Sequence, residues 1–278
     1  MLRVALVQLN STDDPQENLP VTIDFVRKAA KGGASFVLTP EVTNCVSTSR
    51  ALQHEVLQEE GEDITLAALR QEARQLKIWL LIGSLALKTD DPDGRFANRS
   101  FLISPQGDIV AWYDKIHMFD VDISASETHR ESEGFRPGNR AVLGQTEFGA
   151  VGMTICYDLR FPQLHRTLAR AGATILTSPA AFTPVSGAAH WHVLLRARAI
   201  ENGCFVLAPA QCGQHCIRRG QRRHTYGHSL AVSPWGTVLV DGGDRPGVFL
   251  VDLDADEVEE CRRRIPSISH DQLFEGPA

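Results

Sequence analysis

The sequence has few cysteines, no long hydrophobic run and no excess of basic residues, and each shortage excludes a class of protein. Six cysteines at irregular spacing among 278 residues do not form a disulfide framework. The first apolar run, LRVALVQL, is too short and too polar at its end for a signal peptide or a membrane span. The formal net charge is −6, which argues against a nucleic-acid partner. We therefore expect a cytoplasmic protein in a reducing compartment that binds neither nucleic acid nor membrane.

Internal repeats, low-complexity tracts, linkers and a glycine-rich phosphate loop are also missing. Hydrophobic residues make up 43% of the chain and charged residues 22%, which is close to the average for a globular protein. We therefore predict a single domain over residues 1–278, and we expect it to need neither a nucleotide nor another cofactor.

Short apolar segments alternate with longer amphipathic segments, which predicts a mixed α/β fold. Apolar residues at helical spacing predict helices over 15–31, 63–76, 162–171, 188–201 and 255–264. Apolar runs bounded by turn residues predict strands over 2–9, 34–39, 78–87, 99–103, 109–113, 151–155, 174–178, 204–208, 226–233, 238–241 and 248–252. We expect the last three strands to form a meander, and the polar stretch 120–138 to hold little regular structure.

Three reactive side chains each follow an apolar strand: Glu41, Lys115 and Cys156. Strand ends in α/β sheets are where ligands bind, although such residues taken singly are ordinary loop or core residues. A helix start and a cation, Arg160, come soon after Cys156, and both favour the thiolate form. Together, an acid, an ammonium and a thiol are what amide hydrolysis requires.

The segments that contain these residues resemble the three signature blocks of the nitrilase superfamily of carbon–nitrogen hydrolases. The blocks are TPE at 39–41, YDKIHMFD at 113–120 and CYDLRFP at 156–162, and they occur in the family's order. The resemblance covers essentially the whole chain and extends through HW at 190–191, RARAIEN at 196–202 and YGHS at 226–229. It implies an αββα sandwich of two mixed sheets flanked by helices, which commonly forms a homodimer or a higher homo-oligomer.

The resemblance also implies a role for each of the three residues. Glu41 would be the general base, Lys115 would stabilise the oxyanion, and Cys156 would form a thioester acyl-enzyme. A catalytically silent scaffold protein is the alternative from a different class. Because such proteins usually lose one of the three residues, the intact set argues against it.

Two further positions match supporting residues of the superfamily. The backbone N–H of Tyr157 would contribute to the oxyanion hole, because it follows the nucleophile. Glu131 matches a second glutamate that supports the lysine and the substrate, while Glu127 and Glu133 match less well. An ordinary loop carboxylate is the alternative interpretation of Glu131.

Within the superfamily, the chain is similar to the amidases of deaminated glutathione and to the related omega-amidases, which act on 2-oxoglutaramate and 2-oxosuccinamate. The segments LLRARAI at 194–200 and APAQCG at 208–213 favour the first group, whose members release 2-oxoglutarate and cysteinylglycine in metabolite repair. The loop 122–138 has no Pro-Gly directly after the lysine block, only at its far end (Pro137 and Gly138), and the loop 214–224 is unusually basic. Because both loops border the expected pocket, omega-amidase or another aliphatic amidase or carbamoylase activity stays open.

A small anionic amide calls for a guanidinium that binds its carboxylate. Arg160 is the candidate, and an ion pair with Asp158 is the alternative. Phe182 and Ser186 are candidates for the pocket wall. Phe182 could instead be an ordinary packing aromatic, and Ser186 could be the N-cap of the following helix.

Cys212, His215, Cys216 and His224 lie close enough in sequence to suggest zinc, but their spacing fits no zinc pattern. We therefore predict no metal site. The arginines within 218–223 favour a solvated loop over an anion-binding loop.

Overall fold

Two six-stranded β-sheets pack face to face in the computed structural model, which describes residues 1–124, 127–270, 272 and 274–277. In order, the first sheet contains β16 (Gly247–Leu253), β1 (Leu2–Gln8), β2 (Phe36–Leu38), β3 (Trp79–Leu87), β4 (Ala97–Ile103) and β5 (Ile109–Asp114). The second contains β15 (Val238–Asp241), β14 (Leu230–Val232), β11 (Phe205–Ala208), β10 (Ala173–Thr177), β9 (Gly149–Met153) and β8 (Val142–Thr146).

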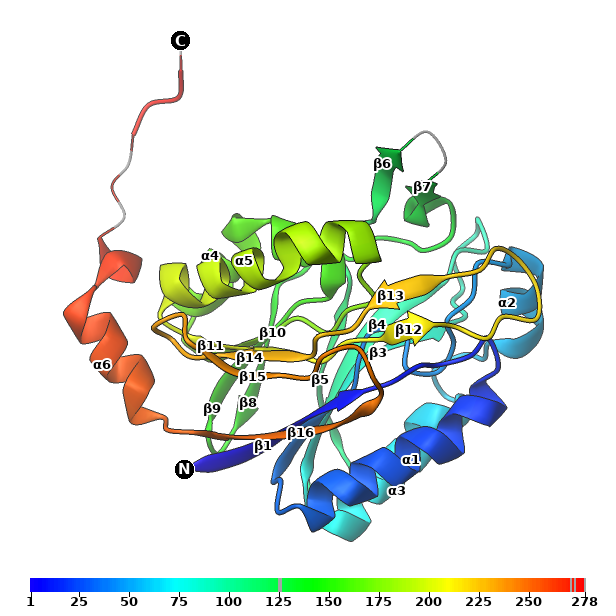
Figure 1. Ribbon diagram of the computed structural model, residues 1–278, viewed down its shortest axis with the longest axis horizontal. Helices are drawn as coiled ribbons and strands as arrows, with labels where there is room; N and C mark the ends of the chain where they lie inside the picture. Colours follow the sequence, from blue (N-terminus) through cyan, green and yellow to red (C-terminus); the bar gives the residue numbers. More distant parts are fainter. Residues whose placement is uncertain (125–126, 271, 273, 278) are drawn as a thin grey trace.

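Helices cover the outer face of each sheet (Figure 1). Those on the first sheet are α1 (Pro15–Lys31) and α3 (Ile64–Leu76), and those on the second are α4 (Pro162–Arg170) and α5 (Pro184–Asn202). The layers therefore run helix, sheet, sheet, helix, which confirms the expected αββα sandwich. Smaller elements are α2 (Arg50–Val56), α6 (Asp256–Arg264), the hairpins β6 (Asp120–Ser124) with β7 (Glu127–Arg130) and β12 (Cys212–Gln214) with β13 (His224–Tyr226), and the 3-10 helices η1 (Glu131–Glu133), η2 (Cys156–Arg160) and η3 (Ser267–Ser269).

The buried core divides between the two faces of the first sheet. Val4 and Leu6 of β1 belong to the cluster shared with the second sheet, whereas Ala5 and Val7 pack in the cluster with α1 and α3. Because successive strand residues point to opposite faces, a strand buried on both faces is a continuous apolar run. This explains why Val4 to Val7 of β1 form an uninterrupted apolar run in the sequence.

Helix α1 has the predicted bounds because both of its ends carry strong signals. The side chain of Asp14 caps the N-terminus by accepting a hydrogen bond from the N–H of Gln16, and Pro15 occupies the first turn. At the other end, the backbone N–H of Gly32 bonds to carbonyls of the last turn.

The predicted terminal meander is wrong. Strands β14 and β15 belong to the second sheet, but β16 crosses to the first sheet and pairs antiparallel with β1, from Leu2 opposite Leu253 to Gln8 opposite Gly247. This pairing covers the hydrogen-bonding edge of β1, which would otherwise be exposed.

Three further local predictions need correction. The stretch 120–138 contains the hairpin β6–β7 and η1, because a two-stranded hairpin can form without an alternating apolar pattern. Helix α5 begins at Pro184 rather than at residue 188, since proline is tolerated in a first turn. The short elements α2 and β8 were not predicted.

The strand directions bring one end of each sheet together. In the first sheet β1, β2 and β3 are parallel, and β5 also runs with them because β4 is antiparallel to both of its neighbours. In the second sheet β9, β10 and β11 are parallel. The two sets of carboxyl ends meet where Leu9, after β1, bridges to Gln211, after β11. The segments that follow β2, β5, β9 and β10 therefore converge.

Gly83 in β3 lies where this convergence is tightest. A Cβ atom at this position would lie 2.0 Å from the carbonyl oxygen of Thr39, 2.5 Å from that of Pro40 and 2.5 Å from Cβ of Pro179. These neighbours belong to the segments that follow β2 and β10, so only a residue without a side chain permits their approach.

We predict that Gly83→Ala lowers the free energy of unfolding by about 3 kcal/mol, because backbone atoms cannot relax away as a flexible side chain can. Urea unfolding followed by circular dichroism measures the change. Gly61→Ala is the matched control, since an added Cβ there meets nothing within 4 Å. Equal stability of the two variants would contradict the prediction.

Candidate active site

The structure brings Glu41, Lys115 and Cys156 together in the buried region where the two sheets converge. Glu41 follows β2, Lys115 follows β5, and Cys156 starts η2 after β9. Their relative exposures are 4%, 2% and 7%. Residues that are 74 and 41 positions apart in the chain therefore form one cluster.

Lys115 binds two carboxylates at once. Its Nζ lies 2.9 Å from Oε1 of Glu41, and 2.9 and 2.8 Å from the two carboxylate oxygens of Glu131. Burial lowers the pKa of the Lys115 ammonium, but the charges of Glu131 and Glu41 outweigh burial and raise this pKa above its ordinary value. The ammonium is thus a fixed positive charge. Glu131 is held in turn by the backbone N–H of Phe119, 2.6 Å from its Oε2.

Glu41 is oriented by hydrogen bonds to both of its carboxylate oxygens. Oε1 accepts from Lys115 and from Nδ2 of Asn98, and Oε2 accepts from the backbone N–H of Ala181, each at 2.9 Å. Burial raises the pKa of the Glu41 carboxyl, but the charge of Lys115 and a hydrogen bond from the Cys156 thiol outweigh it, so the net shift is downward. The lowered pKa favours the ionised carboxylate.

Cys156 has a strained backbone, and its thiol and Glu41 shift each other's pKa. Its φ of 49° lies in the left-handed region, and its N–H donates to the carbonyl oxygen of Pro179 at 2.9 Å. Burial and the Glu41 carboxylate raise the pKa of the thiol well above its ordinary value, and Lys115 offsets them only in part.

The prediction that a helix start and a nearby cation favour the thiolate is therefore wrong for the resting protein. Cys156 begins a short 3-10 helix, η2, and the next α-helix starts only at Pro162. The raised pKa favours the protonated thiol.

The backbone N–H of Tyr157 follows Cys156 in η2, and within the described ranges it donates no hydrogen bond. The Tyr157 ring packs edge-on against Phe119 and Phe161, with centroids 5.1 and 5.5 Å apart. The same ring lines a pocket of about 530 Å³ between the hairpin β6–β7, η2 and α5, which is lined by Phe119, Val121, Ile123, Tyr157, Arg160, Val185, Ser186, Ala189 and His190.

Arg160 lines this pocket without a carboxylate partner among the residues that the structure describes. Its Nη1 lies 3.2 Å from Nδ1 of His190, and its guanidinium lies 5.6 Å from the ring centroid of Phe182. Asp158 is not its partner, because that buried carboxylate bonds to Tyr113 at 2.7 Å, to His117 and to the N–H of Ile155. The alternative of an ion pair with Asp158 is therefore wrong.

Phe182 and Ser186 lie near Arg160 but differ in their surroundings. Phe182 is buried and packs against Trp191 at 4.8 Å between ring centroids, beside the guanidinium of Arg160. Ser186 lines the pocket and shares a 2.9 Å hydrogen bond with Oγ1 of Thr183. Thr183, not Ser186, occupies the N-cap position of α5.

Asn98 was missed by the sequence analysis, and the prediction of a solvated loop is wrong for Arg223. Asn98 in β4 donates to Glu41 at 2.9 Å and to Glu131 at 3.3 Å, and so connects the two carboxylates. Arg223, from the basic loop, donates to the carbonyl oxygen of Ala181 at 3.0 Å, and its charge lowers the pKa of Glu41. No local pattern predicts these contacts, because the partners are remote in sequence.

The structure gives the suggested zinc ligands other roles. His215 uses both ring nitrogens, bonding to the carbonyl oxygen of Ser11 and to Oγ1 of Thr225 at 2.8 Å each. Burial lowers its pKa to about 4. Cys212 is buried whereas Cys216 is exposed, and both are free thiols.

The model of the carbon–nitrogen hydrolase family matches residues 3–263. The chain belongs to this family. It is 37% identical to the deaminated glutathione amidase of Yersinia enterocolitica over 97% of this chain and 93% of that protein. It is 39% identical to the mouse protein of the same name over 96% and 82% of the respective chains.

The fold likewise matches a solved structure of this family. The NitFhit protein of C. elegans superposes with a TM-score of 0.89 at 33% identity, over 98% of this chain and 65% of that one. The chain is therefore a carbon–nitrogen hydrolase, which splits a small amide with water. Among the described residues, no helix is long and apolar enough to cross a membrane.

We predict that Glu41→Gln lowers the pKa of the Cys156 thiol, because it removes the carboxylate charge that raises this pKa. The pH dependence of alkylation by iodoacetamide, with the modified peptide identified by mass spectrometry, measures the shift. Glu133→Gln, an exposed carboxylate of η1, is the control and should leave the titration unchanged. A higher or unaltered pKa in Glu41→Gln would rule out the proposed charge effect.

Proposed function

We propose that the chain is a thiol-dependent amidase that hydrolyses deaminated glutathione to 2-oxoglutarate and cysteinylglycine. The contact of Glu41 with both Lys115 and Cys156, beside a pocket that contains Arg160, carries the proposal. The names of the relatives support the choice of substrate.

In the first half of the reaction, Glu41 takes the proton of the Cys156 thiol as the sulfur attacks the amide carbon. The negative charge that develops on the carbonyl oxygen is stabilised by Lys115 and by the backbone N–H of Tyr157. Glu41 then returns the proton to the leaving nitrogen, the carbon–nitrogen bond breaks, and the acyl group stays on sulfur as a thioester.

In the second half, Glu41 removes a proton from water, and the resulting hydroxide attacks the thioester carbon. The carbon–sulfur bond breaks, the thiol recovers its proton, and the carboxylic acid leaves. Glu131 does not touch the reacting atoms in this scheme. It balances the charge of Lys115 and fixes its position.

Substrate recognition is assigned to the pocket beside η2. The guanidinium of Arg160 would bind a carboxylate of the substrate in a forked arrangement. Phe182 and Ser186 would form part of the wall. The planar faces of Tyr157 and Phe182, 5.8 and 5.6 Å from the guanidinium, support its orientation.

The family resemblance also implies a domain organisation, an oligomeric state and a compartment. Residues 1–278 are treated as one hydrolase domain, which the core cluster from Val4 to Val258 supports. We propose a homodimer or higher homo-oligomer, supported by the exposed apolar side chains of Val193, Ile200 and Trp235. A reducing cytoplasm stays a prediction.

We predict a kcat/KM for deaminated glutathione at least about tenfold higher than for 2-oxoglutaramate, which corresponds to about 1.4 kcal/mol of transition-state discrimination. Side-by-side assays of 2-oxoglutarate release measure the ratio. Cys156→Ala should abolish turnover of both amides without altering the fold, and activity in that variant would overturn the mechanism. Faster hydrolysis of 2-oxoglutaramate would instead identify an omega-amidase.

We predict that Arg160→Ala raises KM for the anionic amide by about 10- to 100-fold, because a hydrogen-bonded charge pair contributes about 1.5–3 kcal/mol. Hydrolysis of a neutral amide such as propionamide should change little. Arg219→Ala is the control, since this arginine pairs with Glu55 at 2.7 Å. Equal losses on both amides in Arg160→Ala would show that the side chain acts structurally.

A further inference from the structure

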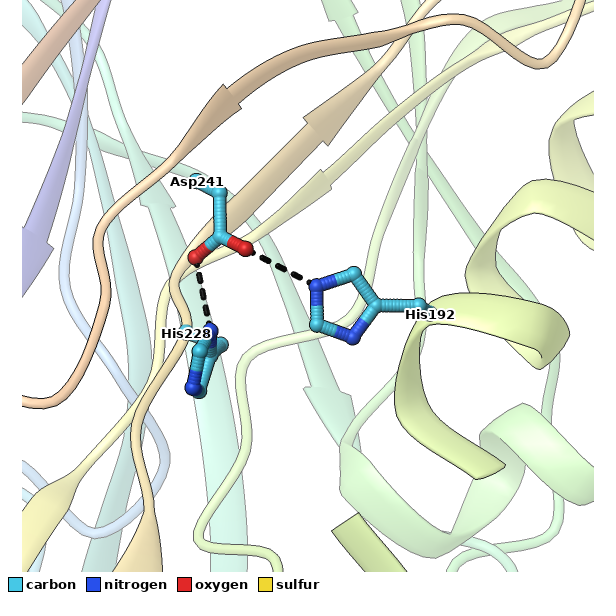
Figure 2. A group of neighbouring side chains, drawn as sticks. All are labelled: His192, His228 and Asp241. Carbon is cyan, nitrogen blue, oxygen red and sulfur yellow. Dashed lines mark hydrogen bonds and ion pairs between the residues drawn. The ribbon is translucent and has the colours of Figure 1, made fainter. Parts of the chain in front are cut away.

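A second cluster of polar side chains lies on the surface, formed by His192, His228 and Asp241. Its residues come from three segments, which are α5, the turn between β13 and β14, and the end of β15. Figure 2 shows both imidazole rings directed at the carboxylate. Nε2 of His192 lies 2.9 Å from Oδ2, and Nδ1 of His228 lies 2.8 Å from Oδ1. The cluster shares no residue with the candidate active site.

The backbone holds this cluster in a specific geometry. His228 has a φ of 55°, which lies in the left-handed region. This region is energetically unfavourable for residues other than glycine. Its N–H donates to the carbonyl oxygen of Gly243 at 2.6 Å, and its own carbonyl accepts from Nε1 of Trp191 at 2.8 Å. The N–H of Gly243 donates to Oδ1 of Asp241 at 2.9 Å. The strained turn and the carboxylate are thus fixed to each other.

Two imidazoles and one carboxylate are a ligand set that suits zinc. The three ligand atoms lie within 4.8 Å of one another. Zinc bonds of about 2.0–2.1 Å place tetrahedral ligands roughly 3.3 Å apart. To bind an ion, the two contacts of 2.8 and 2.9 Å would open by about half an ångström, and the two imidazole nitrogens, which lie within 4.8 Å of each other, would approach by up to about 1.5 Å.

When a metal ion binds, the imidazole protons that point at Asp241 must leave the ligand nitrogens. A neutral imidazole can carry its proton on the other ring nitrogen, whereas an imidazolium releases one to solvent. Side-chain exposures of 34% for His192 and 35% for Asp241 leave room for water as a fourth ligand. Within the described ranges, this is the one group of three such residues close enough to hold an ion.

We propose that His192, His228 and Asp241 form a zinc site that fastens α5 to the edge of the second sheet. The ring of Tyr226 stacks on His228 with centroids 4.4 Å apart, and the Tyr226 N–H donates to the carbonyl oxygen of Phe182 at 2.9 Å. An ion at this site would therefore also stiffen the segment that contains Phe182.

Calorimetric titration of the full chain with zinc chloride tests the proposal. The thiols are first blocked with iodoacetamide so that cysteines do not bind the metal. We expect one zinc ion per chain and an increase in Tm on binding, because a ligand of the folded state stabilises that state. His192→Ala, His228→Gly and Asp241→Asn should each weaken binding by about tenfold or more.

A control variant and conservative substitutions distinguish the loss of a zinc ligand from the loss of the fold. His224→Ala, an exposed histidine outside the cluster, is the matched control and should bind zinc as the unaltered chain does. Glycine at 228 accepts the left-handed backbone, and His192 lies on the partly exposed surface of α5, so these variants test the ligands rather than the fold. Absence of binding, or equal affinity in all variants, would leave a hydrogen-bonded cluster and overturn the proposal.

Discussion

The buried ion triad of Glu41, Lys115 and Glu131 is the constraint on which the rest of the site depends. One ammonium, 2% exposed, is shared between two carboxylates at 2.8–2.9 Å. Removing one member of a buried set leaves an uncompensated charge at a cost of about 3–5 kcal/mol. With one positive and two negative charges, the triad as a whole is anionic. This excess negative charge opposes a thiolate at Cys156.

The sheets determine where these charges can meet. Parallel strands place the segments after β2, β5, β9 and β10 at adjoining edges, and Gly83 allows the backbones to approach. Hydrogen bonds from Asn98 and Ala181 then fix the two oxygens of Glu41 separately. A carboxylate held at both oxygens can transfer a proton without losing its orientation. The precision of the site therefore comes from backbone topology as much as from the reactive side chains.

The sequence predicted the layers of the fold and singled out the three side chains that the structure brings together, because both leave local patterns. Helix α1 has apolar spacing and capping residues within its own segment, and Cys156 stands in a recognisable block. Asn98 could not be found in this way, since its partners are 57 and 33 residues away. The pairing of β16 with β1 also joins the two ends of the chain, and no local pattern encodes that choice of partner.

The net charge of the whole chain does not predict the local charge at the pocket. The net charge of −6 describes the whole surface, and even the basic loop is partly neutralised where Arg218 pairs with Asp13 and Asp14 and Arg219 pairs with Glu55. Arg160 differs because its guanidinium faces the pocket across aromatic rings rather than a carboxylate. An anionic ligand responds to this local field, since surface charges beyond about 8–10 Å are screened by salt. An acidic protein can therefore bind an acidic substrate.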